Sequence, residues 1–150
     1  MSLAGQPPGP LGFVRGAQED GFTVSLGHTT ADHDTACAAY EAGARQATHL
    51  FNAMPPFTHR APGVVGAAFD HPQVPVELIS DGVHIHPSVV RAVFQLFGAH
   101  RVILISDSLL ATVMPDGRYP FGGPDLEVHA HRAPRADGPP PPAGSLPART

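Results

Sequence analysis

Short apolar runs alternate with amphipathic segments through the middle of the chain. The four runs most suited to β-strands, each ending in polar side chains, are residues 22–28, 47–52, 74–81 and 101–107. The intervening segments 29–44 and 87–97 place small or apolar side chains at helical spacing. Apolar strands that alternate with amphipathic helices are typical of a parallel sheet covered by helices. The pattern therefore predicts an α/β fold with about four parallel strands.

Local signals mark where the two helices should begin. Thr30 or Asp32 can cap the first helix, because a side-chain oxygen there accepts a hydrogen bond from a free backbone N–H group. Pro87 suits the first position of the second helix, since its fixed φ matches the helix and its missing N–H group is not needed there. Both segments are therefore expected to form helices.

The two ends of the chain differ from its middle. Residues 1–21 are rich in proline and glycine with few apolar side chains, and residues 139–142 are four consecutive prolines. A proline run lacks backbone donors and favours an extended structure that cannot join a sheet. The sequence thus predicts a disordered lead-in at 1–21, an ordered part at 22–128 and a disordered tail at 129–150.

Composition narrows the class of protein. A chain of 150 residues normally forms one domain, whereas a closed (β/α)8 barrel typically needs about 250 residues. The net charge of −4 and the pI near 6.2 give no basic surface for nucleic acid, and no Lys/Arg run suits a membrane surface. No segment has the roughly 18 consecutive apolar residues of a membrane helix. Cys37 is the only cysteine, which excludes a disulfide framework within the chain and favours a cytoplasmic location.

Polar side chains recur where each predicted strand ends. They are His28, His49, Asn52, Asp81, His84 and Asp107. The carboxyl ends of parallel strands meet at one edge of a sheet, and ligands of parallel α/β folds bind at that edge. For any single histidine, a strand cap or a hydrogen bond in the core is the simpler interpretation. The recurrence at four strand ends favours a functional site.

Two histidines and a carboxylate at adjacent strand ends can form a divalent metal site with positions left open for water. Such a metal lowers the pKa of its water and polarises a carbonyl, which suits hydrolysis of an amide or an ester. Asp107 is placed to take a proton from the water and pass it to the leaving group.

A long loop is expected from Ala53 to about Gly66. It contains Arg60, the only arginine between Arg45 and Arg91. A guanidinium group suits planar or charged oxygens such as those of phosphate or carboxylate. A solvated loop arginine is the alternative interpretation.

Several segments, in this order along residues 22–123, resemble N-acetylglucosamine-6-phosphate deacetylases of the amidohydrolase superfamily. They are GHT at 27–29, ATHLFNAMPP at 47–56, HRAPGVVGAAF at 59–69, ISDGVHIHP at 79–87 and LISDSL at 104–109. The resemblance implies a partial (β/α)8 TIM barrel, namely the second half of that barrel. It also implies hydrolysis of the acetyl group of N-acetylglucosamine 6-phosphate, giving glucosamine 6-phosphate and acetate, with a divalent metal, most often zinc.

The resemblance assigns roles to individual residues. His28 and His49 match metal ligands, and Asp107 matches the catalytic acid and base. The positions that match substrate-binding residues are Asn52, Ala53, Arg60, Asp81, Gly82, Val83 and His84. Family members are often homodimers, with the arginine loop near the subunit interface.

The resemblance also implies a further metal ligand, a glutamate on an earlier strand, in a region to which this chain has no counterpart. A truncated, non-catalytic half-barrel that at most binds metal or sugar phosphate is therefore the alternative function. A hydrolase of the same superfamily with another substrate, such as a cyclic amide, is a third hypothesis.

Overall fold

The computed structural model describes residues 2–3, 9–108, 114–120 and 126–128. Five parallel strands form one sheet, in the same order as in the sequence. These strands are β1 (Ser2–Leu3), β2 (Ser25–Leu26), β3 (Gln46–Ala47), β4 (Val76–Ile79) and β5 (Val102–Ile105). Strands β2, β4 and β5 lie within predicted runs, and β3 overlaps the start of the run at 47–52, so the parallel α/β class is confirmed.

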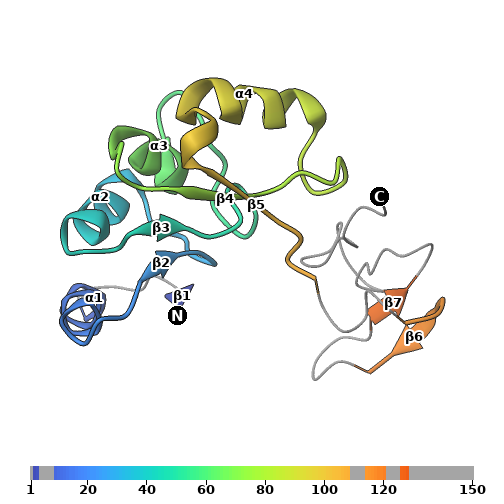
Figure 1. The fold of residues 1–150 in the computed structure, drawn as a ribbon, viewed down its shortest axis with the longest axis horizontal. Coiled ribbons are helices and arrows are strands. Elements are labelled where there is room, and N and C mark those ends of the chain that lie inside the picture. The colour runs from blue at the N-terminus through green and yellow to red at the C-terminus, as the bar shows by residue number, and fades with distance from the viewer. Residues whose placement is uncertain (1, 4–8, 109–113, 121–125, 129–150) are drawn as a thin grey trace.

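Helices connect the strands. They are α1 (Pro10–Glu19), α2 (His33–Glu41), α3 (Gly63–Asp70) and α4 (Pro87–Phe97), and a 3₁₀ turn at Ala99–Arg101 precedes β5. Figure 1 shows the four α-helices arranged in sequence order around one side of the strands. An antiparallel pair, β6 (Gly117–Tyr119) and β7 (Leu126–Val128), lies apart from this sheet. None of the helices in the described part of the chain is long and apolar enough to cross a membrane.

Both predicted helix starts are confirmed. Asp32 is the cap of α2, and its carboxylate accepts a hydrogen bond of 2.9 Å from the backbone N–H group of Thr35. This bond lowers the pKa of Asp32, and it settles the choice between Thr30 and Asp32. Pro87 is the first residue of α4.

The prediction of a disordered lead-in at 1–21 is wrong for residues 10–19, which form α1. Pro10 occupies the first turn, where a proline is compatible with a helix. Val14 and Ala17, three residues apart, lie on the buried face of α1 and belong to the core. Residues three positions apart share one face of a helix, so both side chains pack into the core. The predicted tail at 129–150 lies outside the described residues.

The prediction of a loop from Ala53 to about Gly66 is also wrong for its last four residues, because α3 begins at Gly63. All six residues from Gly63 to Ala68 are buried, so this segment has no polar face that would reveal a helical period. Helix α3 packs against α2 through small side chains. A Cβ atom added at Gly66 would lie 3.5 Å from the His33 ring of α2, and 2.4 Å from the Cβ of Pro62, the residue that precedes α3.

Arg101 is a buried cation at the amino end of β5, and it is only 8% exposed. Its guanidinium donates to the carbonyl oxygens of Ala68 (2.5 Å), His71 (2.9 Å) and Val74 (2.8 and 3.0 Å). The Phe97 ring centre lies 4.9 Å from the guanidinium carbon. Hydrogen bonds from Arg101 thus connect the start of β5 to the end of α3 and to the segment that precedes β4.

Candidate active site

The histidines predicted as metal ligands lie side by side at the carboxyl ends of β2 and β3. Leu26 pairs with Ala47 in the parallel ladder, and His28 and His49 each follow two residues later. Their ring centres are 4.6 Å apart, with the rings at 75° to each other. His49 is 3% exposed, whereas His28 is exposed. The register of the sheet therefore brings together two side chains that are 21 positions apart in the sequence.

The backbone is strained at this edge of the sheet. In the described part of the chain, positive φ values at non-glycine residues occur only in the segments that follow strands β2, β3 and β5. The residues are His28 (47°), His49 (30°), Phe51 (73°), Ala53 (49°) and Asp107 (49°). The left-handed region costs an L-residue about 1–2 kcal/mol, and such strain clusters at active sites. Three of the five are the predicted metal ligands and the predicted acid/base.

Glu77 on β4 supports the turn that carries His49, and the sequence predictions did not include it. One carboxylate oxygen accepts from the side-chain amide of Gln46, and the other lies 3.4 Å from the backbone nitrogen of His49. The backbone oxygen of Glu77 accepts from the N–H group of Leu50 at 2.8 Å. Its position as the single glutamate within the apolar run 74–81 is the sequence feature that could have identified it.

Asn52 closes the same turn. Its side-chain amide donates to the carbonyl oxygens of His49 and Leu50, both at 3.3 Å, and its backbone N–H group donates to the His49 carbonyl at 2.9 Å. Ala53, which is predicted to contact the sugar phosphate, is the next residue in the chain and is exposed. The turn thus places an exposed residue just beyond the two histidines.

The two imidazoles are suited to a divalent metal. The Nδ1 atom of His49 is buried and has no hydrogen-bond partner among the residues that the structure describes. Leaving a buried polar atom unpaired costs about 1–3 kcal/mol, and imidazole nitrogen is a preferred ligand of zinc. Within residues 2–3, 9–108, 114–120 and 126–128, no cluster of three or more His, Cys, Asp or Glu side chains is placed to hold a metal. Among the described residues, His28 and His49 are therefore the two imidazoles at this edge that could hold a metal.

Asp81 and His84 form a second polar pair, in the turn after β4. The Nδ1 atom of His84 lies 2.8 Å from the Asp81 carboxylate, and the side chains of His84 and Asp81 are only 7% and 15% exposed. Gly82 and Val83, the other two predicted substrate-binding residues, lie between them in this turn and are exposed. Asp107 follows β5 and is exposed. In the described part of the chain, Asp107 makes no hydrogen bond to His28, His49 or His84.

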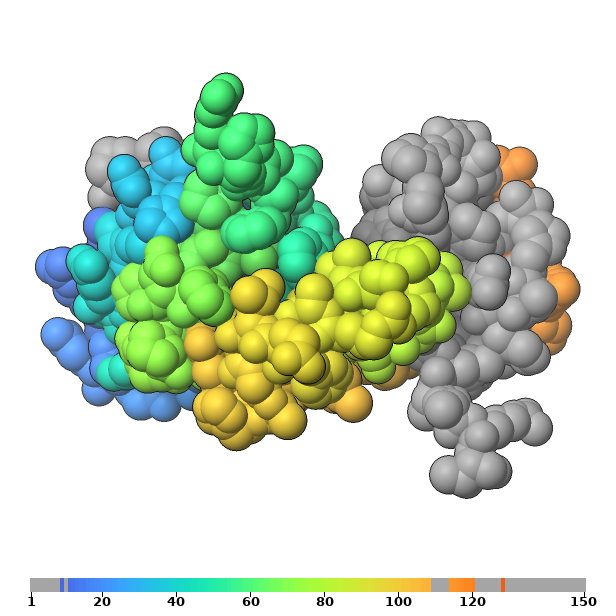
Figure 2. All heavy atoms as spheres, turned by 90° about the horizontal axis from the view of Figure 1, so that it is seen from above, coloured from blue at the N-terminus to red at the C-terminus, as the bar shows by residue number. Residues whose placement is uncertain are grey.

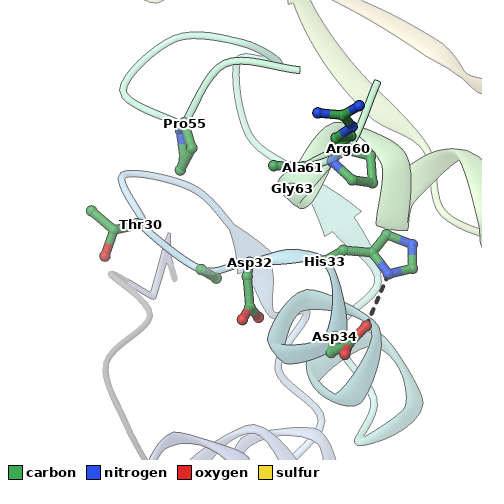
Figure 3. A pocket seen from close by; sticks show the side chains of 10 residues that line it. Thr30, Asp32, His33, Asp34, Pro55, Arg60, Ala61 and Gly63 are labelled. Atoms are coloured by element: carbon green, nitrogen blue, oxygen red, sulfur yellow. Dashed lines mark hydrogen bonds and ion pairs between the residues drawn. The ribbon is translucent and has the colours of Figure 1, made fainter. Parts of the chain in front are cut away.

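Arg60 borders a pocket of about 330 Å³ between the loops that follow β2 and β3. Thr30, Asp32 and His33 line it from the first loop and the start of α2, and Pro55 lies opposite. Figure 3 shows the Arg60 guanidinium turned away from the Asp32 and Asp34 carboxylates. Arg60 is exposed and forms no ion pair with another described residue. Its charge is therefore available to an anion from outside this loop pair.

Comparisons with known proteins place these features in a family context. The chain is 40% identical over 138 residues to the N-acetylglucosamine-6-phosphate deacetylase of Bacillus subtilis (strain 168), covering 92% of this chain and 35% of that protein. It is 42% identical over 122 residues to the enzyme of the same name from Vibrio furnissii, covering 81% of this chain and 30% of the relative. No family model matches the sequence.

The fold agrees with the sequence comparison. An alanine variant of N-acetyl-D-glucosamine-6-phosphate deacetylase from Mycobacterium smegmatis, solved in complex with N-acetyl-D-glucosamine-6-phosphate, matches with a TM-score of 0.89 and 37% identity, covering 95% of this chain and 38% of that chain. The chain is therefore a homologue of part of an amide-cleaving enzyme. In particular, it is homologous to N-acetylglucosamine-6-phosphate deacetylases, and it spans about a third of their length.

Proposed function

We propose that the chain carries part of the active site of a metal-dependent hydrolase that removes the acetyl group from N-acetylglucosamine 6-phosphate. The products are glucosamine 6-phosphate and acetate. The observation that carries this proposal is the His28–His49 pair, with ring centres 4.6 Å apart on strained backbone at two neighbouring strand ends. The homology to deacetylases of this sugar phosphate supports the substrate.

The sheet is, on this proposal, the second half of a (β/α)8 barrel. Support comes from the strand order, which follows the sequence, and from the helix that lies between each pair of successive strands, α3 following a long loop in the connection from β3 to β4. Sequential parallel strands with intervening helices are the repeat of that barrel, and its active sites lie at the carboxyl ends of the strands. The candidate residues of this chain lie at those ends.

His28 and His49 would hold the divalent metal, which we propose to be zinc. When bound, the metal supplies an activated water and polarises the acetamido carbonyl. The remaining ligand would come from outside the described residues. The unpaired Nδ1 atom of His49 and the backbone strain at both histidines support this placement.

Asp107 would act as general base and then as general acid. Its exposed carboxylate can take a proton from the attacking water and give it to the amine that leaves. His84 would bind the sugar, whereas Arg60, Asn52 and the backbone of Ala53 would bind the phosphate end. The bidentate geometry of a guanidinium suits a phosphate group.

We propose a homodimer in the cytoplasm for the active protein. The loop between β3 and α3 projects from the surface next to α2, as Figure 2 shows in green beside light blue. It exposes Phe57 (50% exposed) together with Arg60. Aromatic side chains and arginine are enriched at protein interfaces, so a projecting loop that carries both suits such a contact.

Acetate release by the purified 150-residue chain tests the proposed function. With zinc and N-acetylglucosamine 6-phosphate present, we expect turnover, and we expect Asp107→Asn to reduce kcat by about 10²–10⁴-fold, as for loss of a general acid/base. Asp20→Asn, at an exposed aspartate that follows α1, is the matched control and should leave turnover unchanged.

The truncated, non-catalytic alternative gives a different result in the same experiment. In that case zinc binds with an affinity that His28→Ala and His49→Ala weaken, yet no acetate appears at any enzyme concentration. A chain that binds neither zinc nor the sugar phosphate would contradict both functions.

A further inference from the structure

The Asp81 carboxylate gathers three hydrogen-bond donors from the turn that follows β4. One oxygen, Oδ1, accepts from the backbone N–H groups of Val83 and His84, each at 2.9 Å. The other oxygen, Oδ2, lies 2.8 Å from Nδ1 of the His84 ring. The two oxygens thus have separate roles, because Oδ1 fixes the backbone of the turn and Oδ2 faces the imidazole.

Asp81 is held in its ionised form. Burial by itself raises the pKa of the Asp81 carboxyl, but the bonds from the His84 N–H group, the Val83 N–H group and the His84 ring outweigh burial, and the pKa lies below its usual value. An ionised carboxylate can only accept hydrogen bonds. The proton in the contact with His84 must therefore sit on Nδ1 of the ring.

The other ring nitrogen of His84 has the opposite character. Nε2 is buried and has no hydrogen-bond partner among the residues described by the structure. A neutral imidazole carries one proton, so a proton on Nδ1 leaves a free lone pair on Nε2. A buried lone pair without a donor is unfavourable, and a donor on a ligand that displaces the covering atoms would relieve that cost.

We propose that Asp81 is a positioning residue for the reaction. It holds His84 in the tautomer with the proton on Nδ1, so that Nε2 accepts a hydrogen bond from a hydroxyl or amide N–H group of the amino sugar. This inference rests on the proposed function and deepens it. The sequence resemblance placed Asp81 against the substrate, whereas the geometry commits both of its oxygens to the protein and routes its effect through His84.

Asp81→Asn separates the two roles of the carboxylate. The carboxamide oxygen can keep both backbone bonds, while its NH₂ group faces Nδ1 of His84 and can only donate. The proton of His84 must then move to Nε2, and the lone pair that the ligand needs is lost. Asp20→Asn makes the same chemical change on the exposed surface and should leave His84 unaltered.

Long-range ¹H–¹⁵N correlation spectra of the full chain read out the tautomer directly. The His84 signal is identified as the one missing in His84→Gln. We expect a protonated Nδ1 in the wild type and in Asp20→Asn, and a protonated Nε2 in Asp81→Asn. A protonated Nε2 in the wild type, or an unchanged tautomer in Asp81→Asn, overturns the positioning role. The wild-type spectrum decides the question by itself if Asp81→Asn does not fold.

Titration with N-acetylglucosamine 6-phosphate completes the experiment. We expect the Nε2 signal of the wild type to shift on binding, and Asp81→Asn to bind about tenfold more weakly, the effect of one lost hydrogen bond. Equal affinity of the two proteins overturns the proposed acceptor role. If the tautomers are as expected but neither protein responds to the sugar phosphate, the result supports positioning by Asp81. The same result counts against the proposed function.

Discussion

At the amino ends of β4 and β5, the Arg101 guanidinium donates to the carbonyl oxygens of Ala68, His71 and Val74. At the carboxyl edge of the same sheet, by contrast, two buried ring nitrogens, on His49 and His84, lack a partner among the described residues. All five non-glycine residues with positive φ in the described ranges also follow strands at this edge. The Tyr40 hydroxyl, beside His71, is a buried polar atom that also lacks a described partner, so the two ends of the sheet differ in backbone strain rather than in the presence of unpaired groups.

This difference suggests that the amino end of the sheet serves stability and the carboxyl edge serves ligand binding. Paired polar groups and relaxed backbone lower the free energy of the folded state, whereas unpaired nitrogens and left-handed backbone raise it. The unfavourable features persist at the carboxyl edge because the packed amino end and the α2–α3 contact stabilise the fold around them. In parallel α/β folds, the carboxyl edge binds ligands and the opposite edge serves stability.

Replacing Arg101 should give the largest change in stability. Arg101→Met keeps most of the side-chain volume but removes every hydrogen bond from the guanidinium to the three carbonyls. We expect the free energy of unfolding to fall by about 3 kcal/mol, because hydrogen bonds from a charged group are lost and buried acceptors remain. Urea unfolding followed by circular dichroism measures the change.

Arg45→Met is the matched control for that prediction, since Arg45 is an exposed arginine on the approach to β3. A surface substitution of this kind changes stability by no more than about 0.5 kcal/mol. Equal losses for the two variants would show that the amino end does not hold the sheet together through Arg101.

Gly66→Ala should give the second-largest change. A Cβ atom at residue 66 would lie 2.4 Å from Cβ of Pro62, the residue that precedes α3, so the start of α3 must shift, whereas the His33 ring of α2 at 3.5 Å is an ordinary contact. Overpacking costs about 1–3 kcal/mol, and a contact this short places the cost in the upper part of that range, above the gain of about 1 kcal/mol in helix propensity. Thermal unfolding should therefore show a net loss of stability.

Gly16→Ala tests the same substitution in α1, where an added Cβ meets nothing within 4 Å. Here only the propensity term remains, and we expect a gain of about 0.5–1 kcal/mol. A gain at both positions would contradict tight packing of Gly66 against Pro62 at the start of α3.

The sequence predicted those parts of the fold whose signals are local. The runs 74–81 and 101–107 contain β4 and β5, and Pro87 starts α4 as expected, because strand composition and helix-start preferences act within a few residues. Helix α3 was missed because burial on all sides removes the helical period. Helix α1 was missed because its few buried residues are set among prolines and glycines.

The proximity of His28 and His49 was predictable, but the detailed geometry of the candidate site was not. His28 and His49 follow strands, and the rule that strand ends meet at one edge is enough to pair them. The bond from the His49 backbone to Glu77, and the separate roles of the two oxygens of Asp81, depend on tertiary distances. No spacing in the sequence encodes those distances.

Ala53→Gly measures the strain at the carboxyl edge. Ala53 has a φ of 49° and is exposed, so glycine relieves the left-handed conformation without removing a buried contact. We expect a gain of about 0.5–1 kcal/mol, the relief of strain less the extra entropy of the unfolded chain. Ala61→Gly, in the same loop but without positive φ, should instead lose about 0.5 kcal/mol. A loss in both variants would contradict stored strain at Ala53.

The smallest expected effect concerns His33, a more exposed counterpart of the buried Arg101. Its ring nitrogens face Asp70 at 2.8 Å and Asp34 at 3.2 Å, and its own side chain is 30% exposed. The bond to Asp70, followed by that to Asp34, raises the pKa of His33 above its ordinary value of 6.5. The charged form is therefore favoured in the folded state.

The sign of the pH dependence follows from that shift. Because the folded pKa is the higher one, the stabilisation is fully present below pH 6.5 and is lost as the pH rises through the folded pKa. Its size should be about 0.5 kcal/mol, as for other partly exposed ion pairs. His33→Gln and Asp70→Asn should both remove this pH dependence of the free energy of unfolding. Asp34→Asn should remove less, since the Asp34 side chain is 99% exposed. A larger effect of Asp34→Asn than of Asp70→Asn would show that the raised pKa of His33 does not depend mainly on Asp70.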